Sequence, residues 1–123
     1  MTTKELYELI EGDYESASRT LMNDTIMSRF IVKLLDDKSF SAFKKAAENM
    51  DSKELFESSH AMKGAYANLG LMKLSGMASE ITEEFRPGHA RTMSDAQVTE
   101  KINAIEALYN KTIDGIHRFA DEQ

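Results

Sequence analysis

Hydrophobic residues recur every three or four positions along most of the chain, which is the spacing of amphipathic helices. The strongest run, over residues 26–35, follows Asn23 and Asp24, either of which is suited to cap a helix. Further helices are expected over residues 2–10, 14–22, 39–50, 51–69, 71–85 and 94–119. Short connections between long amphipathic helices favour antiparallel packing. We therefore expect an all-α fold, an antiparallel four-helix bundle with a short extra N-terminal helix.

Composition and charge narrow the class of protein. The chain has 123 residues, enough for one compact domain, so residues 1–123 are expected to form a single domain. The net charge of -6 disfavours nucleic-acid binding, which needs a basic face. The absence of Cys excludes disulfides and thiolate metal sites.

The sequence predicts neither a membrane segment nor a leader. Residues 1–5 lack the basic-then-apolar pattern of a signal peptide, and no apolar run approaches the roughly 20 residues of a membrane span. Together with the lack of Cys, this favours a cytoplasmic protein without membrane contact. The initial Met1 and the complete set of helix caps favour a free-standing protein over a piece of a larger kinase.

A histidine in the helix over residues 51–69 draws attention to one face of that helix. Successive helical residues advance by about 100° around the axis, which puts Leu55, Met62 and Tyr66 on the core face. His60 falls roughly 140° from Leu55 and is therefore expected to be exposed in the middle of the helix. The residues on its side of the helix are Lys53, Phe56, Lys63, Gly64 and Ala67.

Gly64 is an unfavourable residue inside a helix, because Gly lowers helix stability by about 1 kcal/mol relative to Ala. It points away from the core, so a close helix crossing does not explain it. Bare backbone beside His60 would let a bulky phosphorylated partner approach the imidazole, with Lys63 supplying positive charge. An outward Phe56 would suit docking. The competing interpretation is a surface histidine without a role.

The segment from Ser59 to Gly70 resembles the signature of histidine-containing phosphotransfer (HPt) domains. That signature is a His, an apolar residue, Lys and Gly, followed by small residues, Asn, an apolar residue and Gly. Residues 30–36 and 71–85 resemble the helices that flank it in the family. The resemblance implies a four-helix bundle whose surface histidine carries a phosphoryl group between aspartates of receiver domains, in the phosphorelays of two-component signal transduction.

The resemblance also implies roles for individual residues. His60 takes the place of the phosphoacceptor, Lys63 that of the phosphate-facing lysine, and Gly64 that of the glycine that opens space for the partner. Many family members place a polar side chain from the following helix against the imidazole. Thr82, together with Ser79, is the candidate for that contact here.

The implied partners are response-regulator receiver domains and a hybrid sensor histidine kinase, which would dock over Lys53, Phe56 and Ala67. The chain is expected to be a monomer and a phosphohistidine carrier, not an enzyme. Mg²⁺ would be held by the receiver domain, and this chain would bind no cofactor or metal of its own. Two positions depart from the family pattern: Ser59 stands where Ala is common, and Tyr66, on the core face, where a small residue is usual.

Other functions stay open on the sequence alone. Glu57 and His60 have the Glu-x-x-His spacing of di-iron bundles, but such sites need a second inward-facing motif, whose nearest counterpart is Asp114 with His117. A kinase would need a glycine-rich nucleotide site and a receiver alternating strands and helices, and neither pattern is present. The serious alternative is an HPt-fold interaction module without phosphotransfer. His89 and His117 are expected to be inert surface residues.

Overall fold

The computed structural model describes residues 1–123 as seven α-helices and one short 3₁₀ turn, η1, without strands. The elements are α1 Thr3–Leu9, α2 Tyr14–Leu21, α3 Asp24–Lys33, η1 Leu34–Asp36, α4 Ser39–Glu48, α5 Ser52–Asn68, α6 Met72–Glu84 and α7 Asp95–Asp121. Every helix expected from the hydrophobic spacing is present, with ends that agree to a residue or two. The all-α helix-bundle prediction is therefore confirmed.

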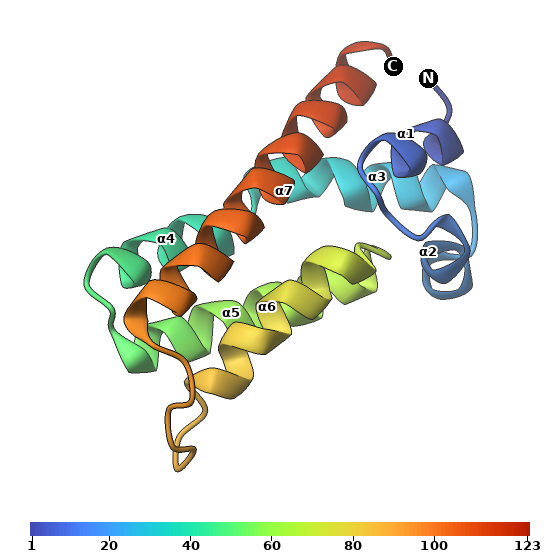
Figure 1. Cartoon of the computed structure of the whole chain (residues 1–123). Helices are drawn as coiled ribbons and strands as arrows, with labels where there is room; N and C mark the ends of the chain where they lie inside the picture. Colours follow the sequence, from blue (N-terminus) through green and yellow to red (C-terminus); the bar gives the residue numbers. More distant parts are fainter.

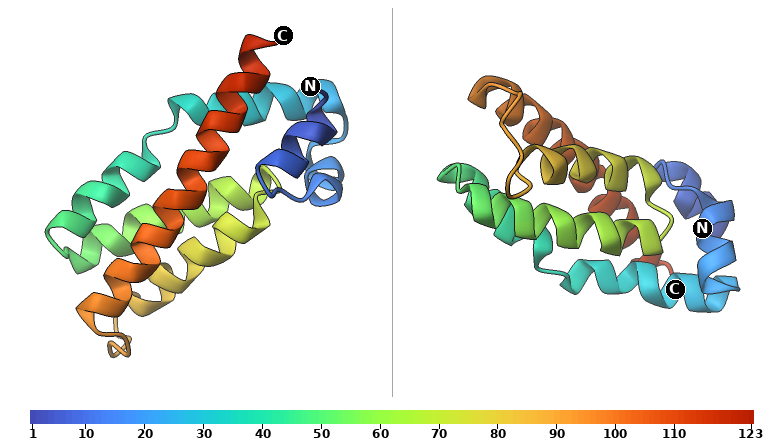
Figure 2. Two further views of the ribbon diagram at one scale, coloured as in Figure 1. Left: turned by 45° about the horizontal axis from the view of Figure 1, so that its top comes forward. Right: turned by 90° about the horizontal axis from the view of Figure 1, so that it is seen from below.

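Helices α4, α5, α6 and α7 form the bundle, and α1, α2 and α3 lie at the end where α5 turns into α6 (Figure 1). In the right-hand view of Figure 2, α5 runs between α6 on one side and α4 on the other, with α7 behind them. The stacked rings of Phe40 and Tyr109, 3.8 Å between centroids, and the Lys44–Glu106 ion pair join α4 to α7. Because α7 also contacts α1 and α3, it ties the N-terminal helices to the bundle.

Polar side chains set the starts of the main helices. The Asn23 side chain, not that of Asp24, caps α3 by accepting a hydrogen bond from the Ile26 amide at 2.9 Å. Asp51 caps α5 in the same way. Ser94 and Gln97 form the expected reciprocal capping box at the start of α7. These caps fix where each helix begins, and so fix the register of its buried face.

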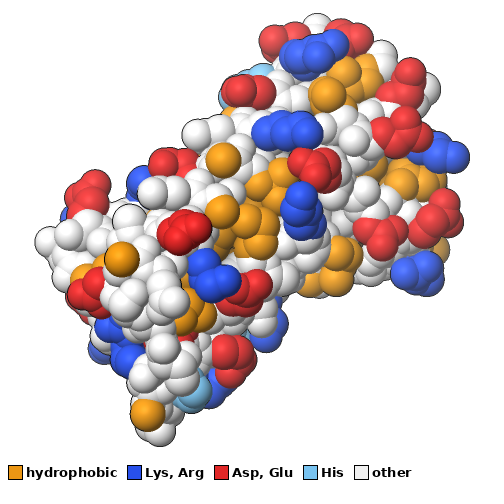
Figure 3. All heavy atoms as spheres, in the orientation of Figure 1, with side chains coloured by type: hydrophobic (Ala, Val, Ile, Leu, Met, Phe, Trp, Pro, Cys, Tyr) orange, Lys and Arg blue, Asp and Glu red, His pale blue; other side chains and the backbone are white.

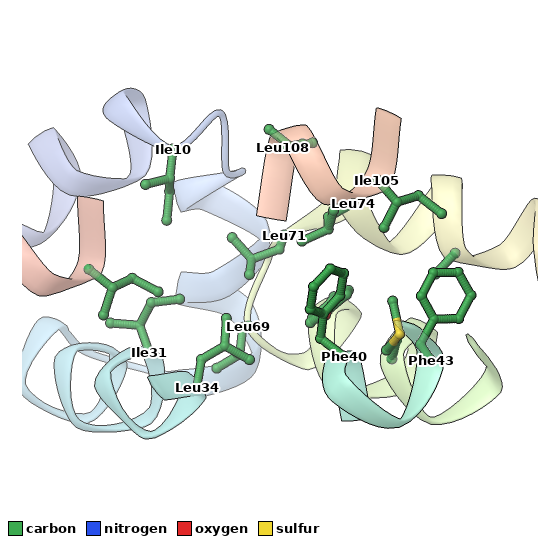
Figure 4. Close-up of a cluster of buried hydrophobic side chains, with 14 of the residues drawn as sticks. Ile10, Ile31, Leu34, Phe40, Phe43, Leu69, Leu71, Leu74, Ile105 and Leu108 are labelled. Carbon is green, nitrogen blue, oxygen red and sulfur yellow. The ribbon is translucent and has the colours of Figure 1, made fainter. Parts of the chain in front are cut away.

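One cluster of 25 buried hydrophobic residues runs through the molecule, and all seven α-helices contribute to it. Figure 4 shows Ile10 and Ile31 from the N-terminal helices in one cluster with Phe40, Leu71 and Ile105 from the bundle. Full burial of each large apolar side chain contributes about 1.5–3 kcal/mol. The N-terminal helices and the bundle are therefore stabilised by the same core.

Gly70 connects the end of α5 to the N-terminal helices. Its backbone has φ +74°, and a Cβ at this position would lie 2.7 Å from both the Ala17 Cβ and the Asp13 carbonyl oxygen. The Gly70 carbonyl accepts a hydrogen bond from the Asp13 amide at 2.7 Å, and the Tyr7 hydroxyl donates to the Leu69 carbonyl at 2.6 Å. Only glycine fits both the dihedral angle and the close approach.

A buried carboxylate holds the loop between α6 and α7. Glu84 is only 3 % exposed and accepts hydrogen bonds from the Thr92 and Met93 amides, the Thr92 hydroxyl and the Arg91 guanidinium. These bonds, with that from the Met93 amide the strongest cause, lower the pKa of Glu84 to about 2. Hydrophobic spacing predicts a loop here, but it cannot reveal this contact, because a Glu at a helix end is expected to face solvent.

Charge is dispersed over the surface in the view that looks onto α7. Figure 3 shows acidic and basic side chains interspersed on this face, with apolar atoms between them. The net charge of -6 is therefore not gathered into one patch on this side.

Candidate functional site

His60 lies exposed near the middle of α5, as the helical spacing predicts. On the opposite side of the same helix, Leu55, Met62 and Tyr66 are completely buried. The helix is held between α4 and α6. The imidazole is therefore presented to solvent from a rigid element and not from a mobile loop.

Gly64 lies one turn beyond His60, and its surroundings are open. A Cβ placed on Gly64 would meet nothing within 4 Å. Close helix packing therefore does not account for this glycine, as the helical spacing also indicates. Together with exposed His60 and half-buried Lys63, it leaves an accessible stretch of backbone beside the imidazole.

Phe56 packs against the imidazole from the preceding turn. The two rings are stacked with their centroids 5.7 Å apart and their planes 8° from parallel. The helical spacing predicts Phe56 to lie outside the core, whereas the structure shows it half-buried and packed against the core. The guanidinium of Arg86, which follows α6, lies over this ring. Phe56 therefore restricts the orientation of the imidazole as well as presenting an apolar edge.

An ion pair at the C-terminal end of α6 completes this side of the site. The Arg86 guanidinium carbon lies 5.4 Å from the centroid of the Phe56 ring. Arg86 donates to Glu83 through Nε at 2.9 Å and Nη2 at 2.8 Å. These hydrogen bonds lower the pKa of Glu83, and the charges of Arg86, Lys63 and His89 lower it further. Positive charge from Lys63 on α5 and from Arg86 after α6 thus acts on the Glu83 carboxylate.

Neither Arg86 nor Glu83 is predicted as a site residue from the sequence. Their i, i+3 spacing at the end of the helix that follows His60 is the signal that could have found them. His89, expected to be inert, is among the groups whose charge acts on Glu83.

The Thr82 hydroxyl, expected against the imidazole, forms its hydrogen bonds elsewhere. Its hydroxyl is completely buried, donates to the Ser59 hydroxyl at 2.9 Å, and lies 3.1 Å from the Ala78 carbonyl oxygen. The reason is that Thr82 points into the seam between α5 and α6, where a buried hydroxyl needs a partner. Ser59, which departs from the family pattern, supplies that partner. Ser79 lies half-buried on the same helix.

A second hydroxyl joins the two helices on the other side of His60. Ser75 donates a hydrogen bond to the Lys63 carbonyl at 2.9 Å. Together with the contact between Thr82 and Ser59, this bond holds α6 to the turns of α5 before and after His60. Neither contact follows from hydrophobic spacing, because each joins polar residues that are distant in sequence.

A groove of about 490 Å³ lies beside the C-terminal half of α5. It is lined by Thr20, Leu21, Phe30, Lys33, Leu34, Asp37, Ala65, Asn68 and Leu69. The sequence places Phe30 in the apolar stripe of its helix, but the structure leaves it 44 % exposed, because Met27 and Ile31 provide the buried face of α3. Phe30 thus provides an apolar surface on the rim of the groove.

The remaining expected site residues are spread along α5. Lys53 is exposed in the first turn of the helix, and Ala67 is half-buried near its end. No group of three or more His, Asp and Glu side chains is placed to hold a metal ion, and the pairs Glu57–His60 and Asp114–His117 do not form one. No helix has the length and apolar character needed to cross a membrane.

Comparison with known proteins identifies a family. The family model described as "Hpt domain" matches residues 26–114, which extend from α3 into α7 and include His60, Lys63 and Gly64. Searches of curated proteins and of solved structures gave no significant match.

Proposed function

The chain belongs to the Hpt domain family, and from this premise we propose that His60 is the residue that carries the phosphoryl group. Members of this family take part in phosphorelays as carriers of a phosphoryl group and are not enzymes. The observation that supports this assignment is an exposed imidazole on a rigid helix, stacked on Phe56, with open space at Gly64. His60 would accept the group from an aspartate of one receiver domain and pass it to an aspartate of another.

The chemistry requires only a nucleophile and correct positioning from this chain. With the proton on Nδ1, the Nε2 lone pair of His60 attacks phosphorus in line with the P–O bond of the aspartyl phosphate. The N–P bond forms, the P–O bond breaks, and the electron pair leaves with the aspartate carboxylate. Transfer onward reverses these steps with a second aspartate. Nε2 is proposed because it projects furthest from the helix.

Lys63 and Gly64 would assist in different ways. Lys63 supplies a positive charge toward the phosphoryl oxygens, a contribution that is modest because exposed ion pairs are worth about 0–1 kcal/mol. Gly64 leaves room for the partner's active site to reach the imidazole. Mg²⁺ would come with the receiver domain, since phosphoryl transfer from an acidic pocket needs charge neutralisation there.

We propose that receiver domains, including that of a hybrid sensor kinase, dock on the face that surrounds His60. Lys53, Phe56 and Ala67 lie along this helix, and the groove with Phe30 at its rim lies beside its C-terminal half. An exposed apolar rim beside the helix that carries His60 supports a docking role. The chain would act as a monomer, so that this face stays free for exchange.

We also propose that residues 1–123 form one such domain in the cytoplasm. The family match leaves out the first 25 residues. Among them, Leu6, Tyr7 and Ile10 are at most 1 % exposed and belong to the same core as the bundle. This shared core supports the inclusion of α1 and α2 in the domain.

The first test uses phosphoramidate, a small phosphoryl donor, and intact-mass analysis. Wild type is expected to gain one acid-labile phosphoryl group, while His60→Gln gains none. His89→Gln and His117→Gln are matched controls, since both residues are exposed, and each should be modified like wild type. A folded wild-type chain without an adduct, or an adduct that persists on His60→Gln, would overturn the assignment and favour an interaction module without phosphotransfer.

A further inference from the structure

The Glu83 carboxylate is linked to His60 through the side chains of Arg86 and Phe56. It binds the guanidinium of Arg86 through two hydrogen bonds, of 2.8 and 2.9 Å, and Arg86 also lies over the Phe56 ring. The Phe56 ring is in turn stacked on the imidazole of His60. Arg86 and His60 therefore contact the same aromatic ring, and Glu83 binds the guanidinium of Arg86.

The ion pair between Glu83 and Arg86 is exposed and can be exchanged. The two side chains are 54 % and 44 % exposed, and such surface pairs contribute little to stability. Arg86 also lies beyond Glu84, the last residue of α6, so its side chain is not confined by a following helical turn. An arginine in this position is free to turn toward a stronger acceptor nearby.

A phosphoryl group on His60 would be such an acceptor. It presents three strongly accepting oxygens and more negative charge than a carboxylate. The planar guanidinium fork matches phosphate as well as carboxylate, whereas lysine provides only a point charge. Glu83 and a phosphoryl group on His60 would therefore compete for the same cation.

We infer that Glu83 is a resident counter-ion that keeps Arg86 beside His60 in the unphosphorylated chain, and that Arg86 moves to the phosphoryl group once His60 is phosphorylated. This inference rests on the proposed function. It makes Arg86 a phosphate-binding residue and Glu83 a positioning residue that competes with the phosphohistidine. Arg86 then prolongs the life of the phosphohistidine, and Glu83 shortens it.

The direction of each effect follows from the transition state for loss of the phosphoryl group. That state is loose and resembles metaphosphate, so the phosphoryl oxygens carry less charge than in the phosphohistidine. Hydrogen bonds from Arg86 stabilise the phosphohistidine more than the transition state and slow its hydrolysis. Without Glu83, Arg86 has no competing acceptor and is more available to the phosphoryl group.

The experiment measures the half-life of the phosphohistidine. Wild type, Arg86→Gln, Arg86→Lys and Glu83→Gln are phosphorylated with phosphoramidate, freed of the donor by desalting, and followed by intact mass. Glu80→Gln is the matched control, because Glu80 is an exposed residue of α6 that forms an ion pair with Lys101 instead. Arg86→Gln is expected to shorten the half-life about threefold and Glu83→Gln to lengthen it about twofold, within the range of one exposed ion pair. Arg86→Lys should fall between Arg86→Gln and wild type, and Glu80→Gln should match wild type.

The signs of the two effects separate this inference from a merely structural role. Arg86→Gln and Glu83→Gln break the same ion pair, so a structural role predicts changes in the same direction. Opposite changes support the inference; equal half-lives, or changes in the same direction, overturn it while leaving the proposed function intact. Failure of wild type to take up a phosphoryl group would instead overturn the proposed function, and this inference with it.

Discussion

The hydroxyl of Thr82 lies 2.9 Å from that of Ser59, the residue that precedes His60, and both side chains are completely buried. The contact joins α6 to α5 immediately before the phosphoacceptor proposed above. It also explains why a serine is tolerated at position 59, where its side chain is completely buried. The surface histidine is thus supported from beneath by polar contacts that solvent does not reach.

Removing one partner of this contact should destabilise the fold. Thr82→Val keeps the shape but leaves the Ser59 hydroxyl with only the Phe56 carbonyl, so we expect a loss of about 1 kcal/mol of unfolding free energy in urea. Ser59→Ala should cost a similar amount. The double variant should cost less than the sum of the two, because neither partner is then left alone. Additive losses would show that the two hydroxyls are not coupled.

Gly64 should lower the stability of the fold and, in return, keep His60 accessible to a partner. Gly64→Ala is expected to raise the unfolding free energy by about 1 kcal/mol, since Ala is the better helix former and its Cβ meets nothing within 4 Å. Gly64→Arg should still react with phosphoramidate, which is small, but lose most of its phosphoryl exchange with a receiver domain. The measurement pairs urea denaturation with transfer from a phosphorylated receiver. Unchanged transfer to Gly64→Arg would place the docking surface elsewhere.

Lys63 should assist transfer without being essential. Because Lys63 is partly exposed, it contributes about 0–1 kcal/mol to binding a phosphoryl group, which corresponds to at most about a fivefold change in rate. Lys63→Ala is therefore expected to slow exchange with a receiver domain by that factor, whereas His60→Gln abolishes it. Stopped-flow or rapid-quench assays with one receiver domain measure both. Complete loss in Lys63→Ala, with its circular dichroism unchanged, would contradict this view of the lysine.

Sequence reasoning located the helices and the exposed histidine because both depend on periodic burial. The spacing of Leu55, Met62 and Tyr66 fixes one face of α5, and the position of His60 follows from helical geometry. What the spacing could not supply are contacts between side chains of different helices. The Thr82–Ser59 contact depends on how α6 packs against α5, which no local pattern encodes.

The same limit applies to the exposure of residues at the boundary between the buried and exposed faces of a helix. Phe56 and Phe30 are hydrophobic residues near the boundary of a buried stripe, and the neighbouring helix decides how far each is covered. Phe56 is half-buried against the core, and Phe30 is 44 % exposed at the groove. The roles of Arg86 and Glu84 were missed because charged residues at a helix end are by default assigned to solvent.

Glu84 should make stability depend on pH below about 4.5. Its pKa is lowered from the ordinary value of 4.5 to about 2 in the folded chain, chiefly by the hydrogen bond from the Met93 amide. A lowered carboxyl pKa contributes stability that is present above the unfolded value and is lost as pH falls toward the folded value. Unfolding free energy should therefore decline between about pH 4.5 and 2.

Glu84→Gln isolates this contribution from those of other carboxylates. At pH 7 the variant should lose about 1.5–3 kcal/mol, the range for hydrogen bonds to a charged group. The gap between wild type and Glu84→Gln should narrow as the pH is lowered from 4.5 toward 2, while Glu80→Gln should stay close to wild type throughout. Urea denaturation at pH 7 and pH 3 measures these differences. A gap that is the same at both pH values would show that the charge of Glu84 is not what holds the loop.

Phe30 should matter for partner binding and little for folding. Its side chain is 44 % exposed on the rim of the groove, so Phe30→Asp removes apolar docking surface and adds a charge without opening the core. If receiver domains dock over this groove, affinity should fall about tenfold or more, as for an aromatic anchor at an interface. Ala104→Asp, which adds the same charge at an exposed position of α7, should bind like wild type. Isothermal titration calorimetry with one receiver domain measures the affinity of both variants.

Because reaction with phosphoramidate needs no docking, both variants should still be phosphorylated at His60. A Phe30→Asp variant that binds as tightly as Ala104→Asp would restrict docking to the residues of α5 itself.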